Sequence, residues 1–301
     1  MNTTPATSRR PLWRSLLFVP AINDRFVAGA AKRGADGILL DLEDSIPPAR
    51  KAEARGRVAE AARIVAAGGP DVLVRINRPW RMALADMEAC VGPDVTALLL
   101  PKVPNAAHVH AAAEVLDELE RERGLAAGHT GLLLLIETPE GLTRINEIAA
   151  AHPRVIGITV GSEDLSSAMG MVPDADSLFV PKMLAAIAAR AAGVLPFGYV
   201  GSIADFSDIE AFRAVVRRAR RLGFAGASCI HPNQVTVLNE EFSPTAEEIA
   251  NAQGIVAAFE AGLREGSGAV QHEGRMLDLP VVDQARAVLE RDAAIRRRAA
   301  R

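Results

Sequence analysis

Eight short, continuously apolar segments recur along the chain, separated by longer segments rich in Ala, Glu, Arg and Leu. The apolar segments span residues 16–20, 37–44, 72–77, 97–102, 132–136, 155–160, 195–200 and 226–230. Unbroken apolar runs are typical of strands that are covered on both faces, and the intervening segments have the composition of helices. Eight strand–helix pairs within about 230 residues predict an α/β fold, a TIM (β/α)8 barrel.

An open, doubly wound parallel sheet is the alternative fold. Such a sheet usually carries a G-x-G-x-x-G turn after its first strand. The corresponding segment, residues 19–23, reads VPAIN. The absence of these glycines favours the barrel.

The chain divides into three parts by its sequence. Residues 1–13 are polar and we expect a flexible tail; residues 14–240 hold the predicted barrel; and residues 241–301 form a C-terminal helical extension. The basic run 296–298 suits the end of a helix, where the helix dipole is negative. No signal-peptide pattern or apolar run of about 20 residues is present, so we expect a cytoplasmic protein with no membrane partner.

Composition excludes further classes of function. A net charge of -3 argues against a broad nucleic-acid surface, and 4% aromatic residues argue against base stacking. The two cysteines, Cys90 and Cys229, cannot build a disulfide framework, which agrees with a reducing compartment.

Polar side chains gather at the carboxyl ends of the predicted strands, where the active sites of barrels lie. They are Asp41, Glu43, Asp44, Arg75, Asn77, Lys102, Glu137, Glu163, Asp164, His231 and Asn233. A single charged residue there marks only the end of a strand. Six strands that end in this way indicate a functional site.

Glu137 and the pair Glu163/Asp164 follow neighbouring strands, so they should lie close together and repel unless a cation is present. An all-oxygen cluster suits a hard divalent ion, above all Mg2+, with Mn2+ as a substitute. In the alternative interpretation, Arg75 and Lys102 neutralise the acids in a salt-bridge network. Arg75 interrupts an apolar run, so its buried guanidinium is also a candidate for binding a carboxylate or a developing oxyanion.

Nucleophilic catalysis has little support. The sequence has no G-x-S-x-G motif. Cys229 and His231 point to one side of a strand, but a buried structural thiol is the more common case. Lys102 at a strand end leaves a Schiff base as a weak alternative.

These same residues carry a resemblance to a known family. The sequence resembles the HpcH/HpaI aldolase and citrate lyase β-subunit-like superfamily, near its malyl-CoA and citramalyl-CoA lyases. The matching blocks, in order, are RSLLFVPA (14–21), GADGILLDLEDSI (34–46), VLVRIN (72–77), LLLPKV (98–103), LIETPEGL (135–142), VGSEDLS (160–166), GFAGASCIHPNQVTVLNEEFSP (223–244) and GRMLDLPVV (274–282).

The resemblance implies a Mg2+-dependent carbon–carbon lyase that cleaves or forms a 3-hydroxyacyl-CoA thioester, with a 2-oxo acid or glyoxylate and an acyl-CoA as the other reactants. It also implies a homotrimer, or a hexamer of two trimers. The implied roles are metal ligands for Glu137 and Asp164, water-mediated metal contacts for Asp41, Glu43 and Asp44, catalysis for Arg75, and acid–base catalysis for Asp278 in a neighbouring subunit's site. Substrate or CoA contacts are expected from Arg14, Phe18, Pro20, Lys102, Ile230, His231 and Pro232.

The sequence departs from the family pattern at two places. Relatives often have Tyr-x-Pro-Gly after the first strand, where this chain has FVPA (18–21), and many have an aspartate near the end of the seventh strand that is missing from PFGYVGSIADFSD (196–208).

Two other enzymes remain as alternatives: a citryl-thioester lyase that acts with partner subunits, and a class II-type aldolase on a free hydroxy-oxo acid. A third alternative is a non-catalytic subunit that keeps the barrel.

Overall fold

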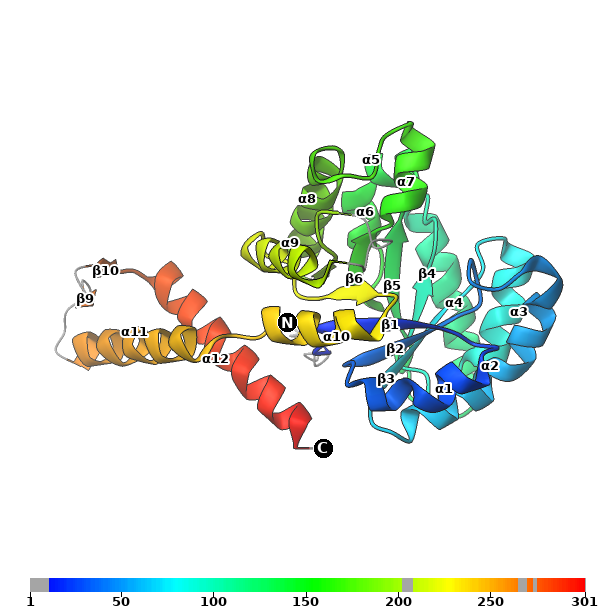
Figure 1. The fold of residues 1–301 in the computed structure, drawn as a ribbon, viewed down its shortest axis with the longest axis horizontal. Coiled ribbons are helices and arrows are strands. Elements are labelled where there is room, and N and C mark those ends of the chain that lie inside the picture. Colours follow the sequence, from blue (N-terminus) through cyan, green and yellow to red (C-terminus); the bar gives the residue numbers. More distant parts are fainter. Residues whose placement is uncertain (1–10, 202–207, 265–269, 273–274, 301) are drawn as a thin grey trace, which may run out of the picture. The chain divides into compact units, whose positions relative to one another are not determined.

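The computed structural model describes residues 11–201, 208–264, 270–272 and 275–300 (Figure 1). It divides into two compact units between residues 240 and 241, and each is described by itself. The expected N-terminal tail lies largely outside the described residues.

The first unit contains eight parallel strands in one sheet. They are β1 (Ser15–Pro20), β2 (Gly37–Asp41), β3 (Asp71–Arg75), β4 (Ala97–Leu100), β5 (Gly131–Ile136), β6 (Val155–Val160), β7 (Leu195–Phe197) and β8 (Ala227–Cys229). The order β7-β6-β5-β4-β3-β2-β1-β8 places sequence neighbours side by side, and a parallel bridge between Phe197 and Gly226 joins the two ends. The predicted TIM barrel is confirmed, and the doubly wound alternative is wrong.

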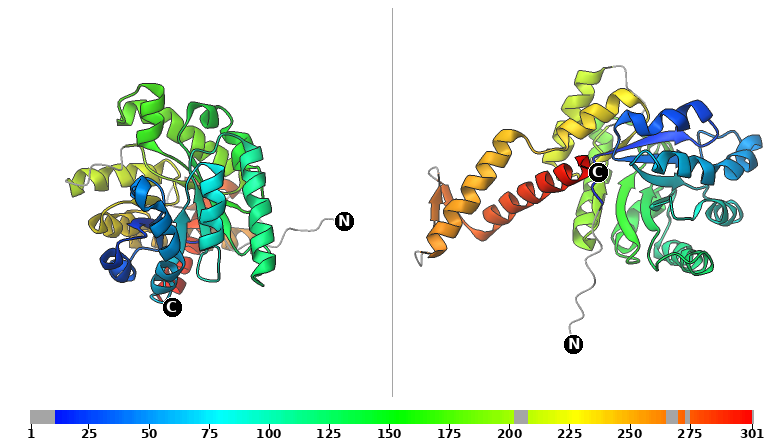
Figure 2. Two further views of the ribbon diagram at one scale, coloured as in Figure 1. Left: turned by 90° about the vertical axis from the view of Figure 1, so that its right-hand side faces the viewer. Right: turned by 90° about the horizontal axis from the view of Figure 1, so that it is seen from below.

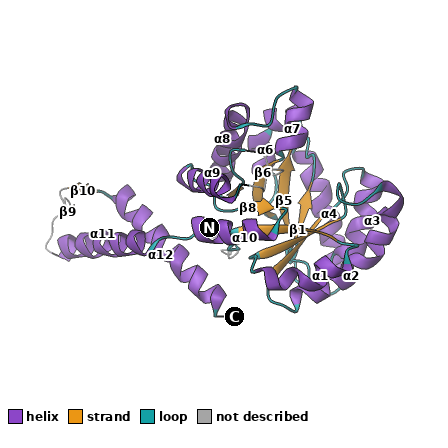
Figure 3. Cartoon of the chain, in the orientation of Figure 1, coloured by secondary structure: helices purple, strands orange, loops and turns teal. Residues whose placement is uncertain are grey.

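Helices surround these strands, as the secondary-structure colours of Figure 3 show. The α-helices of this unit are α1 (Asp24–Ala30), α2 (Lys51–Ala66), α3 (Trp80–Cys90), α4 (Ala106–Glu122), α5 (Pro139–Thr143), α6 (Ile145–Ala149), α7 (Ser162–Met169), α8 (Ala175–Ala192), α9 (Ile209–Arg221) and α10 (Pro232–Glu241), with 3-10 turns η1 (Ala31–Arg33) and η2 (Pro48–Arg50). Asp208 is the N-cap of α9, and its carboxylate accepts from the backbone N–H groups of Glu210 and Ala211.

Two local details concern the segments after β5 and β6. After β5 the chain forms two short helices, α5 and α6, which meet at Arg144. β6 ends at Val160, as predicted, and Glu163 and Asp164 lie beyond it in the first turn of α7. Carboxylates are favoured there by the positive end of the helix dipole.

The barrel interior is closed at the amino ends of the strands. Leu16, Leu39, Leu73, Leu99, Leu133 and Phe197 form a buried cluster with Trp13. The Trp13 indole N–H donates to Asp71 Oδ2 at 2.7 Å. Beside it, Arg14 pairs with Asp36 at 2.8 Å. The packed interior leaves the opposite, carboxyl end of the barrel for a pocket.

The second unit is a helical extension, as predicted. It comprises α11 (Ala246–Arg264), an antiparallel pair of strands β9 (Val270–His272) and β10 (Arg275–Leu277), and α12 (Leu279–Ala299) (Figure 2). Phe259, Leu277 and Val282 form its buried core. Packing of this unit on a neighbouring subunit stays a prediction. None of the described helices is long and apolar enough to cross a membrane.

Candidate active site

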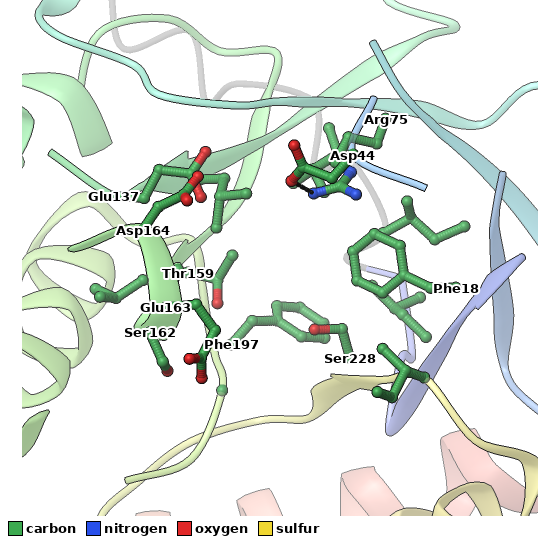
Figure 4. A pocket seen from close by; sticks show the side chains of 18 of the residues that line it. Phe18, Asp44, Arg75, Glu137, Thr159, Ser162, Glu163, Asp164, Phe197 and Ser228 are labelled. Atoms are coloured by element: carbon green, nitrogen blue, oxygen red, sulfur yellow. Dashed lines mark hydrogen bonds and ion pairs between the residues drawn. The ribbon is translucent and has the colours of Figure 1, made fainter. Parts of the chain in front are cut away.

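A cavity of about 450 Å³ opens at the carboxyl ends of the strands. Its apolar floor is made by strand side chains such as Leu39, Leu133 and Phe197, and its rim is polar. Nine of the residues predicted for the rim and the site line it: Phe18, Pro20, Asp41, Asp44, Arg75, Glu137, Glu163, Asp164 and Ile230. Figure 4 shows Glu137 and Asp164 close together on one side of the pocket, with Arg75 and Asp44 across from them.

Arg75 is the last residue of β3 and is held by three acids. Its Nε and Nη2 donate to the two carboxylate oxygens of Asp41 at 2.6 Å each, and Nη1 lies 2.9 Å from Glu43 and 3.0 Å from Asp44. Its guanidinium also lies over the Phe18 ring, 4.9 Å from the centroid. Burial favours the neutral form, but these hydrogen bonds and charges outweigh it and raise the pKa of Arg75. The guanidinium is therefore permanently charged and fixed in direction.

Asp41 organises the loop that follows β2. Besides Arg75, its carboxylate accepts from the backbone N–H groups of Glu43 at 2.9 Å and Ser45 at 3.0 Å. Burial opposes ionisation, but the Arg75 hydrogen bonds and charge and the two N–H donors together lower the pKa of Asp41. The sequence places Asp41 and Arg75 on adjacent strands, and the register makes them direct partners.

Lys102 connects the acids on the other side of the pocket. Its backbone N–H donates to Glu137 Oε1 at 3.0 Å, and its Nζ lies 2.8 Å from Asp164 and 3.4 Å from Glu43. Lys102 has a φ of 50°, in the left-handed region that non-glycine residues rarely adopt. The salt-bridge network that the sequence allows as an alternative is thus present. A substrate contact by Lys102 stays a prediction.

Glu137 has a strongly perturbed proton equilibrium. Burial, followed by the negative charges of Glu43 and Asp164, raises the pKa of Glu137 to about 8, despite Lys102 and Arg75. Gly161 allows this carboxylate to sit where it does, since a Cβ on Gly161 would lie 2.4 Å from Glu137 Oε2. The acids around Glu137 therefore carry more negative charge than Arg75 and Lys102 neutralise.

The donor set fits a hard divalent cation. Glu137 and Asp164 offer carboxylate oxygens in a cluster that a cation would stabilise. In the described part of the chain, no three His, Cys, Asp or Glu side chains group closely enough to hold a metal by themselves. Two carboxylates alone leave coordination positions for water and substrate oxygens, as Mg2+ sites commonly do.

Four other predicted residues, Arg14, His231, Pro232 and Asp278, are not among the side chains that line this pocket. Arg14 precedes β1 and pairs with Asp36 at the other end of the barrel. Pro232 is the first residue of α10, and the N–H of His231 just before it donates to Gln234 at 3.1 Å. Asp278 lies in the second unit and caps α12, accepting from the Val281 N–H at 3.2 Å.

Sequence reasoning missed Lys182, which lines the same pocket from α8. Its side chain is only 4% exposed, and burial lowers its pKa to about 8. The available signal was a lone lysine in the apolar segment LFVPKMLAA (178–186). A charged residue inside an otherwise apolar helix usually faces a partner or a polar cavity.

The comparisons with known proteins identify the family. A model of the family HpcH/HpaI aldolase/citrate lyase matches residues 14–232. The chain belongs to this family, and the resemblance stated from the sequence is confirmed.

Individual relatives are similar over nearly their whole length. The citrate lyase subunit beta of Leuconostoc mesenteroides is 36% identical, covering 93% of each chain, and the L-malyl-CoA/beta-methylmalyl-CoA lyase of Cereibacter sphaeroides is 33% identical, covering 92% of this chain and 93% of its own. Among solved structures, CitE from Mycobacterium tuberculosis, in complex with magnesium, acetoacetate and coenzyme A, has a TM-score of 0.74 at 30% identity, covering 94% of this chain and 99% of its own.

Proposed function

We propose that the protein is a Mg2+-dependent carbon–carbon lyase that cleaves or forms a 3-hydroxyacyl-CoA thioester such as malyl-CoA or citramalyl-CoA. One observation carries the proposal. Two carboxylates, Glu137 and Asp164, share Lys102 as a partner on one side of a pocket that Arg75 lines from another strand. The relatives named as citrate and malyl-CoA lyases support the same chemistry.

Glu137 and Asp164 would hold the ion, with Asp41, Glu43 and Asp44 arranged around it through water. When bound, Mg2+ supplies a Lewis acid for the oxygens of a 2-oxo acid. Burial, and after it the negative charges of Glu43 and Asp164, raise the pKa of Glu137. The positive charge of the bound ion would oppose both effects and favour the ionised form of Glu137.

Arg75 would stabilise negative charge on the thioester oxygen as the carbon–carbon bond breaks. Its guanidinium cannot lose its proton under these conditions and is held by Asp41, so little reorganisation is needed when that charge develops. The apolar floor of the pocket would lower the local dielectric constant and strengthen this interaction.

Asp278 would exchange a proton with the enolate carbon of the acyl-CoA. Its carboxylate lies on the second unit and is exposed. We propose that a homotrimer, or a hexamer of trimers, brings it to the pocket of a neighbouring subunit. Phe18, Pro20, Lys102, Ile230, His231 and Pro232 would border the thioester.

The test is a direct assay of the purified protein with malyl-CoA and citramalyl-CoA, with Mg2+ and then with EDTA. We expect release of glyoxylate or pyruvate that stops with EDTA, and a loss of about 100- to 1,000-fold in kcat for Arg75→Lys. No release from any 3-hydroxyacyl-CoA, or equal rates in both conditions, contradicts the proposal.

The similarity to citrate lyase β subunits supports a second candidate, cleavage of a citryl thioester on a carrier protein. The same assay with the carrier-bound citryl thioester distinguishes it from the first. A third arm with the free hydroxy-oxo acid identifies an aldolase that needs no thioester.

A further inference from the structure

Lys182 places a buried cation on a part of the pocket that the proposed mechanism leaves unused. Its ammonium group donates one hydrogen bond, to the Val160 carbonyl oxygen at 2.6 Å. Within the described residues its ammonium group makes no ion pair, although the charge of Glu163 favours its protonated form. An ammonium group has three donors, and a buried charge is costly without a counter-charge. Lys182 can therefore bind an anion beyond the groups that the described residues supply.

Tyr199 offers a second free donor at the same pocket. Its side chain is 4% exposed, and its hydroxyl finds no hydrogen-bond partner in the part of the chain that the structure describes. The ring is fixed by edge-on contact with Phe212 at a centroid distance of 5.4 Å. Buried hydroxyls are normally satisfied, so an unsatisfied one that lines a cavity indicates a missing ligand atom.

Gly198 leaves room beside the Lys182 ammonium group. It has a φ of 123°, which side-chain-bearing residues rarely adopt. A Cβ there would lie 3.6 Å from the Lys182 Nζ and 3.5 Å from the Thr159 hydroxyl. Any longer side chain would fill the space beside the ammonium group, so glycine keeps this recess open.

The recess is separate from the cationic group of the proposed mechanism. Thr159 belongs to β6 and Gly198 follows β7, whereas Arg75 ends β3, and two strands stand between. Arg75 already has three carboxylate partners. Among the described residues, Arg75 is thus already paired with carboxylates, whereas Lys182 makes no ion pair.

We propose that Lys182, Tyr199 and Gly198 form a subsite for a second carboxylate of the ligand, so that among 3-hydroxyacyl-CoA thioesters this enzyme prefers one with a dicarboxylic product over malyl-CoA and citramalyl-CoA, whose products lack that second carboxylate. The ammonium and phenol groups would both donate to that carboxylate, and its charge would balance Lys182. The inference rests on the proposed function for the nature of the ligand. The carboxylate has two sources, the 2-oxo acid or the acyl chain of the thioester.

The experiment measures binding by calorimetry in the presence of Mg2+, with probes matched in carbon number. For the oxo acid these are 2-oxoglutarate and 2-oxopentanoate; for the thioester they are succinyl-CoA and butyryl-CoA. We expect the protein to bind the diacid of at least one pair about tenfold more tightly than its monoacid, because a charge-assisted hydrogen bond is lost in the monoacid.

Lys182→Met should abolish that preference while changing the affinity for the monoacid less than about twofold, and Lys182→Arg should retain part of it. Tyr199→Phe should reduce it several-fold and is the milder variant if Lys182→Met folds poorly by circular dichroism. A protein with no preference in either pair, or a Lys182→Met or Tyr199→Phe variant with an unchanged preference, overturns the subsite.

Because binding is measured without turnover, the outcome is separate from that of the lyase assay. A preference that disappears in Lys182→Met, in a protein that releases no oxo acid from thioesters, would uphold the subsite and reject the proposed function. Normal lyase activity in a protein with no preference for diacids would uphold the proposed function and reject the subsite.

Discussion

The backbone N–H of Lys102 donates to Glu137 Oε1 at 3.0 Å, and Lys102 adopts a φ of 50° at this point. The left-handed conformation after β4 is what turns this N–H toward β5. The residue therefore has two functions that can be separated by mutation. Its backbone fixes Glu137, and its ammonium group pairs with Asp164.

Lys102→Val should be less stable than Lys102→Asn by about 1–2 kcal/mol, because a β-branched residue is strained at positive φ and asparagine tolerates it. Both variants lose the ammonium group, so their difference isolates the backbone. Urea unfolding measures the two free energies. Equal stabilities would show that the positive φ is not maintained in solution.

Mg2+ should raise the melting temperature of the protein, because a ligand that binds only the native state stabilises it by about 2.7 kcal/mol at 100 times its Kd. Glu137→Gln and Asp164→Asn should each remove this stabilisation, since each loses a proposed ligand oxygen. Differential scanning fluorimetry with and without Mg2+ gives the answer. A full Mg2+ shift in both variants would place the ion elsewhere.

Gly161→Ala should weaken Mg2+ binding by an order of magnitude or more, because the new methyl group would lie 2.4 Å from Glu137 Oε2 and must displace it. Gly56→Ala in α2 is the matched control. Nothing lies within 4 Å of its added Cβ, and alanine should stabilise that helix by about 0.5–1 kcal/mol. Mg2+ titrations of the two variants followed by calorimetry compare them, and similar affinities would contradict the crowding at Gly161.

Because of Lys182, the stability of the protein should increase with pH in the alkaline range. Burial lowers its pKa to about 8 from an ordinary value of 10.5, so the folded protein binds fewer protons than the unfolded chain between these values. The cost of burying the charge is present in full below pH 8 and is relieved as the pH rises toward 10.5. The unfolding free energy should rise by on the order of 3 kcal/mol in total, because each unit of difference between the folded and unfolded pKa corresponds to about 1.4 kcal/mol.

The measurement is the difference in unfolding free energy between the wild-type protein and Lys182→Met at pH 7.5 and pH 10. Each group other than Lys182 titrates alike in both proteins and cancels. The unfolding free energy of the wild type should rise relative to that of Lys182→Met as the pH rises. A constant difference would mean that Lys182 is solvated and not buried.

Variants of Asp278 can separate its role as the N-cap of α12 from its proposed role in acid–base catalysis. Asp278→Asn should keep the hydrogen bond to the Val281 N–H and change stability by less than about 0.5 kcal/mol, whereas Asp278→Ala should cost about 1 kcal/mol. If Asp278 moves a proton in the reaction, both variants should lose activity by about 100-fold or more. An active Asp278→Asn enzyme would leave Asp278 only its capping role.

The order of apolar runs along the sequence was enough to predict the barrel fold. Residues such as Ile38, Leu39 and Leu40 are completely buried, as an unbroken apolar strand requires, and helices between successive strands leave few topologies other than a closed parallel sheet. The position of polar residues at strand ends also determined which side chains could meet, because those ends share one rim.

Only the tertiary structure decided which of those side chains are partners. The register of β2 against β3 sets Asp41 opposite Arg75, and the turn at Lys102 brings a backbone N–H, not the ammonium group, to Glu137. Lys182 reaches the pocket from a helix, 45 residues after Glu137 in the chain. Such contacts depend on how elements pack, and residue spacing within one segment carries no record of packing between segments that are far apart in the sequence.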